Sequence, residues 1–260
     1  MTSFIKFLGT AGARIVVSKQ FRASGGIWLE LSGTAVHIDP GPGALVRALS
    51  SRPKLNPEKL AGILLSHRHL DHSNDLNIMV EAMTEGTTRK RGTVFLPADA
   101  IEKEPVFFSY LQERVERIVT LEEGGVYQLG VLQFTTPFRH LHSAETYGFT
   151  FPLSRGNLSL IVDTLYDDAL LTAYQHSRVL VLNTVRLKKD PLPNLQHLCI
   201  PDAEHLIREI NPELAILTHF GMTIVRDKPW EIAENLSQKT GVRVIAATDG
   251  LSVNLGFLEG

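Results

Sequence analysis

Short runs of apolar residues, divided by glycine, proline and polar turns, recur along the chain. Strands are predicted for residues 4–8, 26–31, 35–39 and 63–65, where branched and aromatic residues gather. Further strands are predicted for residues 94–96, 127–135, 158–162, 215–218, 242–247 and 251–255. The strand-rich start and the later strand series fit two similar halves of a sandwich.

Between these runs, apolar residues recur at helical spacing. The spacing predicts helices over residues 44–50, 75–84, 110–118 and 201–210, with apolar faces that would cover a sheet, and a loop over residues 183–190. Pro201 suits the first turn of the last of these helices, and Pro212 follows its end. The pattern therefore predicts an α/β chain with no linker that would divide it.

The densest group of metal-binding side chains follows one of the predicted strands. Residues 61–65 are apolar, and the next seven residues supply His67, His69, Asp71 and His72. Burying unpaired polar groups costs about 2–7 kcal/mol each, whereas imidazole and carboxylate are ligands for zinc, iron and manganese. In an extended segment His67 and His69 point the same way, while Asp71 and His72 follow where a helix can begin. The stretch therefore predicts a metal site whose two halves can bind different ions.

This stretch, His67-Arg68-His69-Leu70-Asp71-His72, resembles the HxHxDH signature of the metallo-β-lactamase superfamily. The resemblance implies a four-layer αββα sandwich, in which two mixed β-sheets are flanked by helices, and a single domain spanning residues 1–260. It extends from the opening Phe7-Leu8-Gly9-Thr10 to Asp249-Gly250, and the histidine and aspartate signature is its most specific part.

Three further residues match ligands of that superfamily. His142 precedes Tyr147-Gly148-Phe149 at a distance that resembles ribonuclease Z and the phosphonate-pathway cyclic phosphodiesterases, with His140 as the alternative. Asp163 and His219 each follow a predicted strand. The resemblance implies one metal held by His67, His69 and His142, a second held by Asp71, His72 and His219, and Asp163 bridging the two. It also implies that Asp39, at the end of another strand, supports the ligands without binding metal.

Composition describes the setting of this chemistry. The chain has 260 residues, of which 43% are hydrophobic, so it can bury a large core. Its net charge of -2 gives no general attraction to nucleic acid or to an anionic membrane. Cys199 is the only cysteine, which excludes an internal disulfide and suits a reducing compartment. No apolar run approaches the roughly 20 residues of a membrane span. We therefore expect a soluble, cytoplasmic protein with no membrane partner, and a homo-oligomer remains open.

The implied metal pair predicts a hydrolase. Two divalent ions about 3.5–4 Å apart acidify a shared water and supply metal-bound hydroxide at neutral pH. Zinc is expected, with manganese or iron as alternatives, because histidine and aspartate bind all three. A histidine rather than a glutamate at His69 argues against the di-iron, oxygen-reducing branch of the superfamily.

The expected substrate is a small phosphodiester. The opening strand, the Tyr147-Gly148-Phe149 strand and the segment around His197 all resemble phosphodiesterases more than lactamases. The resemblance implies that His197 gives a proton to the leaving group, although a structural role is as well supported, and Asp71 is counted with it as catalytic. RNA is not favoured, because the chain lacks the long glycine- and proline-rich arm of ribonuclease Z. A thioesterase or lactonase-type hydrolase and a non-catalytic metal-binding scaffold are the alternatives.

Overall fold

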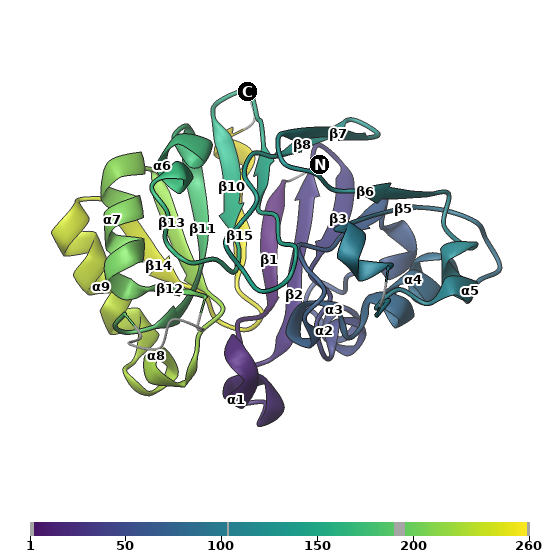
Figure 1. Cartoon of the computed structure of the whole chain (residues 1–260), viewed down its shortest axis with the longest axis horizontal. Helices are drawn as coiled ribbons and strands as arrows, with labels where there is room; N and C mark the ends of the chain where they lie inside the picture. The colour runs from purple at the N-terminus through teal and green to yellow at the C-terminus, as the bar shows by residue number, and fades with distance from the viewer. Residues whose placement is uncertain (1–2, 103, 190–195, 259–260) are drawn as a thin grey trace.

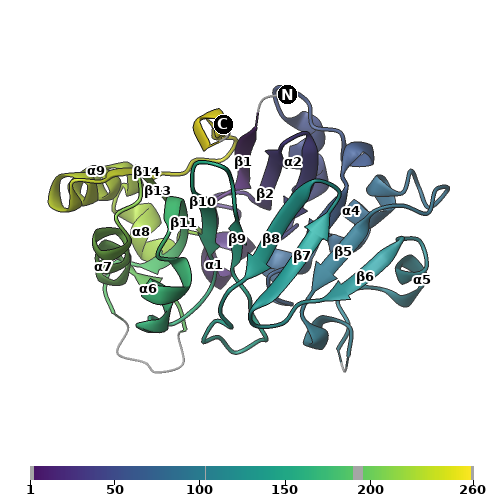
Figure 2. The ribbon, with the colours of Figure 1, turned by 90° about the horizontal axis from the view of Figure 1, so that it is seen from above.

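The computed structural model describes residues 3–102, 104–189 and 196–258. Two mixed β-sheets lie face to face, and helices cover the outer face of each (Figure 1). The view from above shows the same order, with α6, α7 and α9 on one side and α4 and α5 on the other (Figure 2). This arrangement confirms the predicted four-layer αββα sandwich.

The N-terminal sheet has seven strands in the order β15-β1-β2-β3-β4-β5-β6. Its strands β3 to β6 run parallel, whereas β1 pairs antiparallel with β2 and with β15, which returns from the end of the chain. The strands are β1 (Phe4–Gly9), β2 (Ser24–Leu31), β3 (Thr34–Ile38), β4 (Gly62–Leu64), β5 (Thr93–Leu96), β6 (Arg117–Thr120) and β15 (Ser252–Asn254). The associated helices are α1 (Ala13–Ser18), α2 (Ala44–Ser50), α3 (Leu70–Ser73), α4 (Leu76–Met83) and α5 (Ser109–Gln112), with 3-10 turns η1 (Pro57–Lys59) and η2 (Ala98–Ala100).

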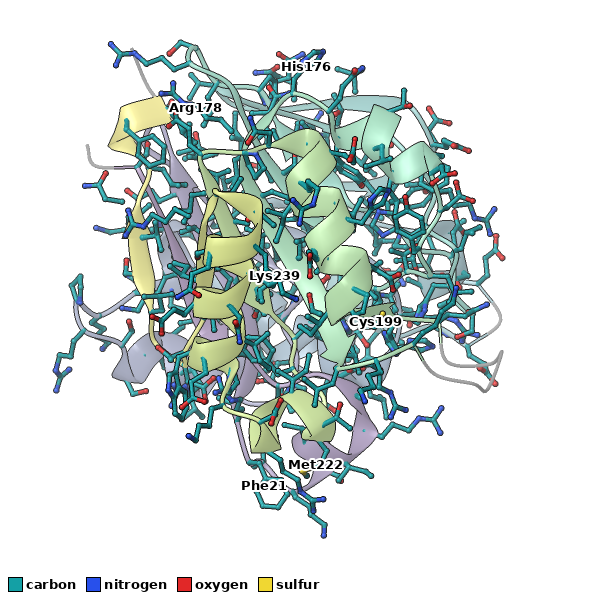
Figure 3. All side chains as sticks on the ribbon, turned by 90° about the vertical axis from the view of Figure 1, so that its left-hand side faces the viewer. Phe21, His176, Arg178, Cys199, Met222 and Lys239 are labelled. Carbon is teal, nitrogen blue, oxygen red and sulfur yellow. The ribbon has the colours of Figure 1, made fainter. Side chains whose placement is uncertain are left out.

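The C-terminal sheet has eight strands in the order β14-β13-β11-β10-β9-β8-β7, with β12 added beside β11. The strands are β7 (Gly125–Leu129), β8 (Leu132–Thr136), β9 (Phe149–Phe151), β10 (Asn157–Ile161), β11 (Ser177–Arg186), β12 (Leu198–Cys199), β13 (Leu214–Thr218) and β14 (Arg243–Ala246). The helices are α6 (Ala169–Tyr174), α7 (Ile200–Ile210), α8 (Met222–Arg226) and α9 (Pro229–Thr240), followed by the 3-10 turn η3 (Gly256–Leu258). Helices α7 and α9 lie side by side over the outer face of this sheet, and Cys199 marks the start of α7 (Figure 3).

Side-chain alternation along the strands divides the core into three layers. On β1, Ile5 and Phe7 face the opposite sheet, while Leu8 packs beneath α2 and α4. The third apolar layer lies between the C-terminal sheet and helices α6, α7, α8 and α9. Within the described residues, no helix is both long and apolar enough to cross a membrane. Both sheets are thus buried on two faces where they run parallel, which explains their continuous apolar sequences.

Three expectations about local structure are wrong. Residues 110–118 do not form one helix, because α5 ends at Gln112 and Ile118 instead pairs with Val94 in the parallel sheet. Sheet pairing here outweighs the helical spacing of the apolar residues. Residues 127–135 are two strands of a hairpin that turns at Gly130, where φ is +60°. Residues 183–190 are not all loop, since β11 continues to Arg186 beside β13 and β12; residue 190 lies outside the described residues.

Candidate metal centre

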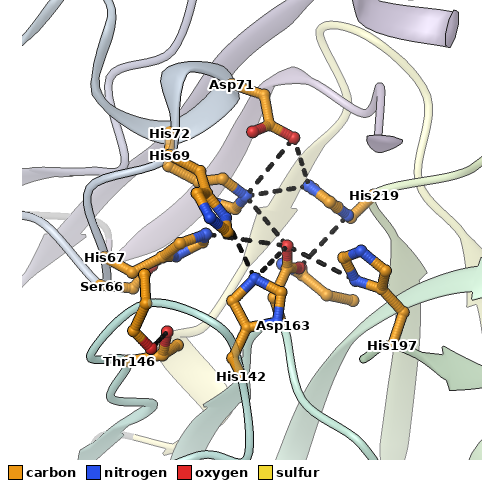
Figure 4. A network of polar contacts seen from close by, with 12 residues as sticks. Ser66, His67, His69, Asp71, His72, His142, Thr146, Asp163, His197 and His219 are labelled. Atoms are coloured by element: carbon orange, nitrogen blue, oxygen red, sulfur yellow. Dashed lines mark hydrogen bonds and ion pairs between the residues drawn. The ribbon is translucent and has the colours of Figure 1, made fainter. Parts of the chain in front are cut away.

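The histidines and carboxylates of the centre leave the ends of strands from both sheets. His67 and His69 follow β4, and His72 lies on the short helix α3. Asp163 follows β10, and His219 comes directly after β13. Carboxyl ends of parallel strands lie at one edge of a sheet, so the face-to-face packing of the sheets brings these side chains together (Figure 4).

Ligand-type atoms form two groups of three, and a third group of three links them. One atom from each of His67, His69 and His142 lies within 4.8 Å of the others. The same separation holds within the set Asp71, His72 and His219, and within the set His67, His72 and Asp163.

Asp163 lies between the two groups. Its Oδ2 is 3.4 Å from His72 Nε2 and 3.8 Å from His67 Nε2, and its Oδ1 is 3.3 Å from His219 Nδ1. The amide of Asn183 donates a 2.9 Å hydrogen bond to Oδ1 and fixes the carboxylate. One buried carboxylate is thereby placed within reach of both groups.

A hydrogen-bond chain from Asp39 fixes the tautomers of two histidines. His72 Nδ1 donates to Asp39 Oδ2 over 2.9 Å, because an ionised carboxylate only accepts. The Ser66 hydroxyl donates to the same oxygen over 2.7 Å, so Ser66 Oγ is left to accept from His67 Nδ1 over 3.0 Å. When neutral, both imidazoles therefore present an unprotonated Nε2 to the centre, which is the form that binds metal. Asp39 thus contacts His72 and Ser66, as expected for a residue that supports metal ligands.

His142 is oriented in the same way by the main chain. Its Nδ1 donates to the carbonyl oxygen of Gln196 over 3.0 Å, which leaves Nε2 as a lone-pair donor. That Nε2 lies 3.0 Å from His69 Nδ1, and His72 Nε2 lies 3.0 Å from His219 Nε2. His69 Nδ1 and His219 Nε2 can donate the proton in these two contacts, and a cation could take the place of that proton.

Buried nitrogen atoms in the centre also lack partners. Among the described residues, His67 Nε2, His197 Nδ1 and His219 Nδ1 are buried and accept or donate no hydrogen bond. Unpaired buried polar atoms are costly, and here they converge on one small space. The donor set and the unpaired atoms therefore fit divalent metal ions.

Local electrostatics keep His67, His142 and Asp163 in their metal-binding states, whereas His72 retains a proton. Burial lowers the pKa of His67 well below its usual value and that of His142 to about 4, so both rings are neutral at pH 7. Burial opposes ionisation of Asp163, but the neighbouring histidines, His219 first, outweigh it and hold the pKa of this carboxyl well below its usual value. For His72 the carboxylates outweigh burial, and its pKa stands well above normal. A cation would compete with that proton for the same Nε2 atom.

Backbone conformation at the centre is unusual. Asp39 and His219 have φ values of +52° and +59°, in the left-handed region that costs non-glycine residues energy. Gly12 and Gly41 allow close approach, because a Cβ atom would overlap the carbonyl group of His219 at Gly12 and that of Asp71 at Gly41. The turns around the ligands thus depend on glycine for space.

The structure separates the histidines that sequence left open. His140 is turned away from the centre and forms a 2.8 Å hydrogen bond with the Tyr174 hydroxyl, whereas His142 faces His69. His197 lies inside the cluster, with Nδ1 at 3.6 Å from Asp163 Oδ2. Part of the segment that suggested a role for His197, residues 194–195, lies outside the described residues.

Sequence reasoning missed Asn183 and the Gln196 carbonyl group. Asn183 follows an apolar run along β11, just as Asp163 and His219 follow apolar strands, so the same pattern could have identified it. The Gln196 contact uses a backbone oxygen, which any residue could supply.

Comparison with known proteins assigns the chain to a family. A profile described as "Beta-lactamase superfamily domain" matches residues 34–220, which include all seven predicted ligands. The chain belongs to the metallo-β-lactamase superfamily. This is a superfamily of metal-dependent hydrolases, and the histidine and aspartate clusters suit divalent metal binding.

Relatives extend the match over the whole chain. An uncharacterized protein of Methanocaldococcus jannaschii, MJ1374, is 36% identical over 260 residues, covering 96% of this chain and 94% of the relative. The metallo-β-lactamase fold protein YhfI from Bacillus subtilis is structurally similar, with a TM-score of 0.79 at 16% identity, covering 98% of this chain and 100% of YhfI.

Two further solved structures share the fold. A diphosphatase from the PhnP family matches with a TM-score of 0.71 at 19% identity, covering 98% of each chain. The short form of human tRNase Z matches with a TM-score of 0.68 at 16% identity, covering 96% of this chain and 98% of that one. At these identities the likeness establishes the fold alone.

Proposed function

We propose that this protein is a dinuclear metal-dependent hydrolase that cleaves small phosphodiesters. The observation that carries the proposal is the placement of Asp163 between two three-residue groups, with His197 beside it. Two bound divalent ions would acidify water and stabilise charge on the attacking and departing oxygens. Zinc is the proposed metal, with manganese or iron as alternatives, since the donor set suits all three.

Seven side chains are the proposed ligands. One group would hold the first ion, the other group the second, and the carboxylate between them would reach both. Asp39 and Ser66 orient two of the imidazoles, and the Gln196 carbonyl orients a third. The proposed ligands are His67, His69 and His142 for one ion, Asp71, His72 and His219 for the other, and the bridging residue Asp163.

His197 is the proposed proton donor to the leaving group. Burial lowers its pKa, while the nearby Asp163 carboxylate opposes that shift. An anionic phosphodiester bound beside the ring would favour the protonated form, so the substrate itself would help to charge the acid. Asp71 is proposed as a catalytic residue as well as a ligand, because its side chain is 20% exposed while that of Asp163 is only 2% exposed. It can therefore contact water and substrate directly.

The choice of a phosphodiester is supported by two structural neighbours, one a diphosphatase of the PhnP family and the other a tRNase Z. A small substrate is preferred over RNA because the net charge is -2 and the sequence lacks the long glycine- and proline-rich arm of ribonuclease Z. A thioesterase, a lactonase-type hydrolase and a metal-binding scaffold are the competing functions.

A substrate panel tests the proposal. Purified protein supplied with zinc or manganese is assayed with chromogenic phosphodiesters, thioesters and lactams. Turnover of phosphodiesters alone supports the proposed reaction, turnover of another class replaces it, and turnover of none supports a scaffold. His197→Ala should lower phosphodiester turnover about 10²–10⁴-fold with unchanged metal content. His205→Ala removes an exposed histidine of α7 and is the control. Equal rates for both variants would remove His197 from the mechanism.

A further inference from the structure

A cavity lined by basic side chains lies on the outer face of the N-terminal sheet. The cavity of about 260 Å³ is lined by Lys6, Arg47, Ser50, Ser51, Arg52 and Gly250, and by none of the proposed metal ligands. Because Ile5 and Phe7 face the opposite sheet, Lys6 faces the side covered by α2, and α2 carries Arg47. The cavity is therefore formed between β1 and the end of α2, separate from the metal centre.

Three positive charges line this cavity without a compensating acid. Lys6 is only 5% exposed, and its Nζ donates a 3.0 Å hydrogen bond to the Arg52 carbonyl oxygen. Arg47 Nε donates to the Leu8 carbonyl oxygen over 3.1 Å. Across residues 3–102, 104–189 and 196–258, no carboxylate lies within 4.0 Å of the charged groups of Lys6, Arg47 or Arg52. A buried ammonium is stabilised by a partner of opposite charge, so this site favours an anion.

A buried hydroxyl without a hydrogen-bond partner also favours an anionic ligand here. Ser51 is 9% exposed, and its Oγ is buried without a hydrogen-bond partner in the described part of the chain. A hydroxyl beside an ammonium and two guanidinium groups offers several donors and no charged acceptor. Arg52 and Gly250 are exposed, so the cavity is open to solvent at one side.

We propose that this cavity binds a phosphate group, either as inorganic phosphate or as the end of a small phosphomonoester. A tetrahedral oxyanion can accept several charge-assisted hydrogen bonds at once, and Lys6, Arg47 and Arg52 line this cavity with Ser51 beside them in its wall. The volume suits a small anion and is below that of sites for larger ligands, about 300–1,000 Å³. This site is independent of the hydrolytic reaction proposed for the metal centre.

A matched pair of variants tests the site by calorimetry on zinc-loaded protein. Arg52 and Lys54 are both exposed cations of the same segment, but only Arg52 lines the cavity. Arg52→Met should weaken binding of inorganic phosphate about tenfold or more, because it removes a charge-assisted contact. Lys54→Met removes the same charge nearby and should change binding less than about twofold. Equal affinities for the two variants would overturn the proposal. Glycerol 3-phosphate, tested in parallel, shows by its relative affinity whether the phosphomonoester or the free ion is preferred.

Diffraction locates the anion directly. Crystals of the wild type soaked in arsenate should show anomalous scattering from arsenic between Lys6 and Arg52, and crystals of Arg52→Met should lose that peak. Arsenate at the metal centre would appear as a separate peak present in both proteins. Arsenic at the metal centre alone would refute a site in the cavity.

Discussion

Replacing Asp39 with asparagine tests whether the hydrogen-bond chain prepares the metal ligands. Asp39 is nearly buried and accepts three hydrogen bonds, from the Ser66 N–H, the Ser66 hydroxyl and His72 Nδ1, at 2.6, 2.7 and 2.9 Å. Asparagine has almost the same shape, and its amide oxygen can still accept from the Ser66 N–H. Its NH₂ group would face His72, however, and would require Nδ1 to become the acceptor. The proton of His72 would then lie on Nε2, where the metal should bind.

The expected loss can be estimated from this change of tautomer. Removing a partner that orients a metal-binding histidine typically lowers metal affinity 10–100-fold, or about 1.4–2.7 kcal/mol. Loss of the negative charge acts in the same direction, because the Asp39 carboxylate, which contacts His72, would attract a cation held by that ring. The ion proposed to bind Asp71, His72 and His219 should be affected most, since Asp39 contacts His72 directly.

Metal affinity is measured by competition with a chromophoric chelator, and circular dichroism checks that the variant is folded. Asp75→Asn is the control, because this acid lies at the start of α4 and contacts the Leu45 N–H rather than a proposed ligand. Asp39→Asn should lose one ion at chelator concentrations that leave the Asp75→Asn protein with two. A folded Asp39→Asn protein with wild-type affinity for both ions would show that the hydrogen bonds of Asp39 do not orient the metal ligands.

Three other perturbations give distinct outcomes. Chelation should lower the melting temperature and zinc should restore it, because the buried donors lose their partner; an unchanged melting temperature would contradict a bound metal. Gly41→Ala should reduce metal content by displacing the carbonyl group of Asp71, whereas Gly43→Ala, where a Cβ atom meets open space, should retain the metal. Burial lowers the pKa of His37 to about 4, so the unfolded chain gains a proton near pH 6.5 that the folded state does not accept. His37 therefore favours folding above about pH 6.5, and this contribution is lost as the pH falls toward 4. In urea unfolding, the slope of the unfolding free energy against pH between these values counts the protons taken up on unfolding. His37→Gln should lower that count by up to about one, and an unchanged slope would refute this assignment.

The sequence by itself determined the features that depend on neighbours along the chain. Apolar runs ending in polar residues located β4, β10 and β13 and the side chains that follow them. The spacing within residues 67–72 indicated a metal site, since those side chains are close in any conformation that a short segment can adopt. The limits of α2 were predicted to the residue, because a short amphipathic helix between glycine and proline turns needs no distant partner.

Only the tertiary structure decided which distant groups meet. Strand pairing placed the end of the expected helix, residues 117–118, in β6, and it extended β11 until Asn183 reached Asp163. Sheet packing also turned His142 toward His69 and His140 toward Tyr174, a choice that the spacing of two histidines one residue apart could not reveal. The phosphate cavity likewise joins residues 6, 47–52 and 250, which no periodicity relates. Local patterns predict which face of a helix or strand a residue occupies, whereas contacts across the sandwich depend on how the two sheets pack.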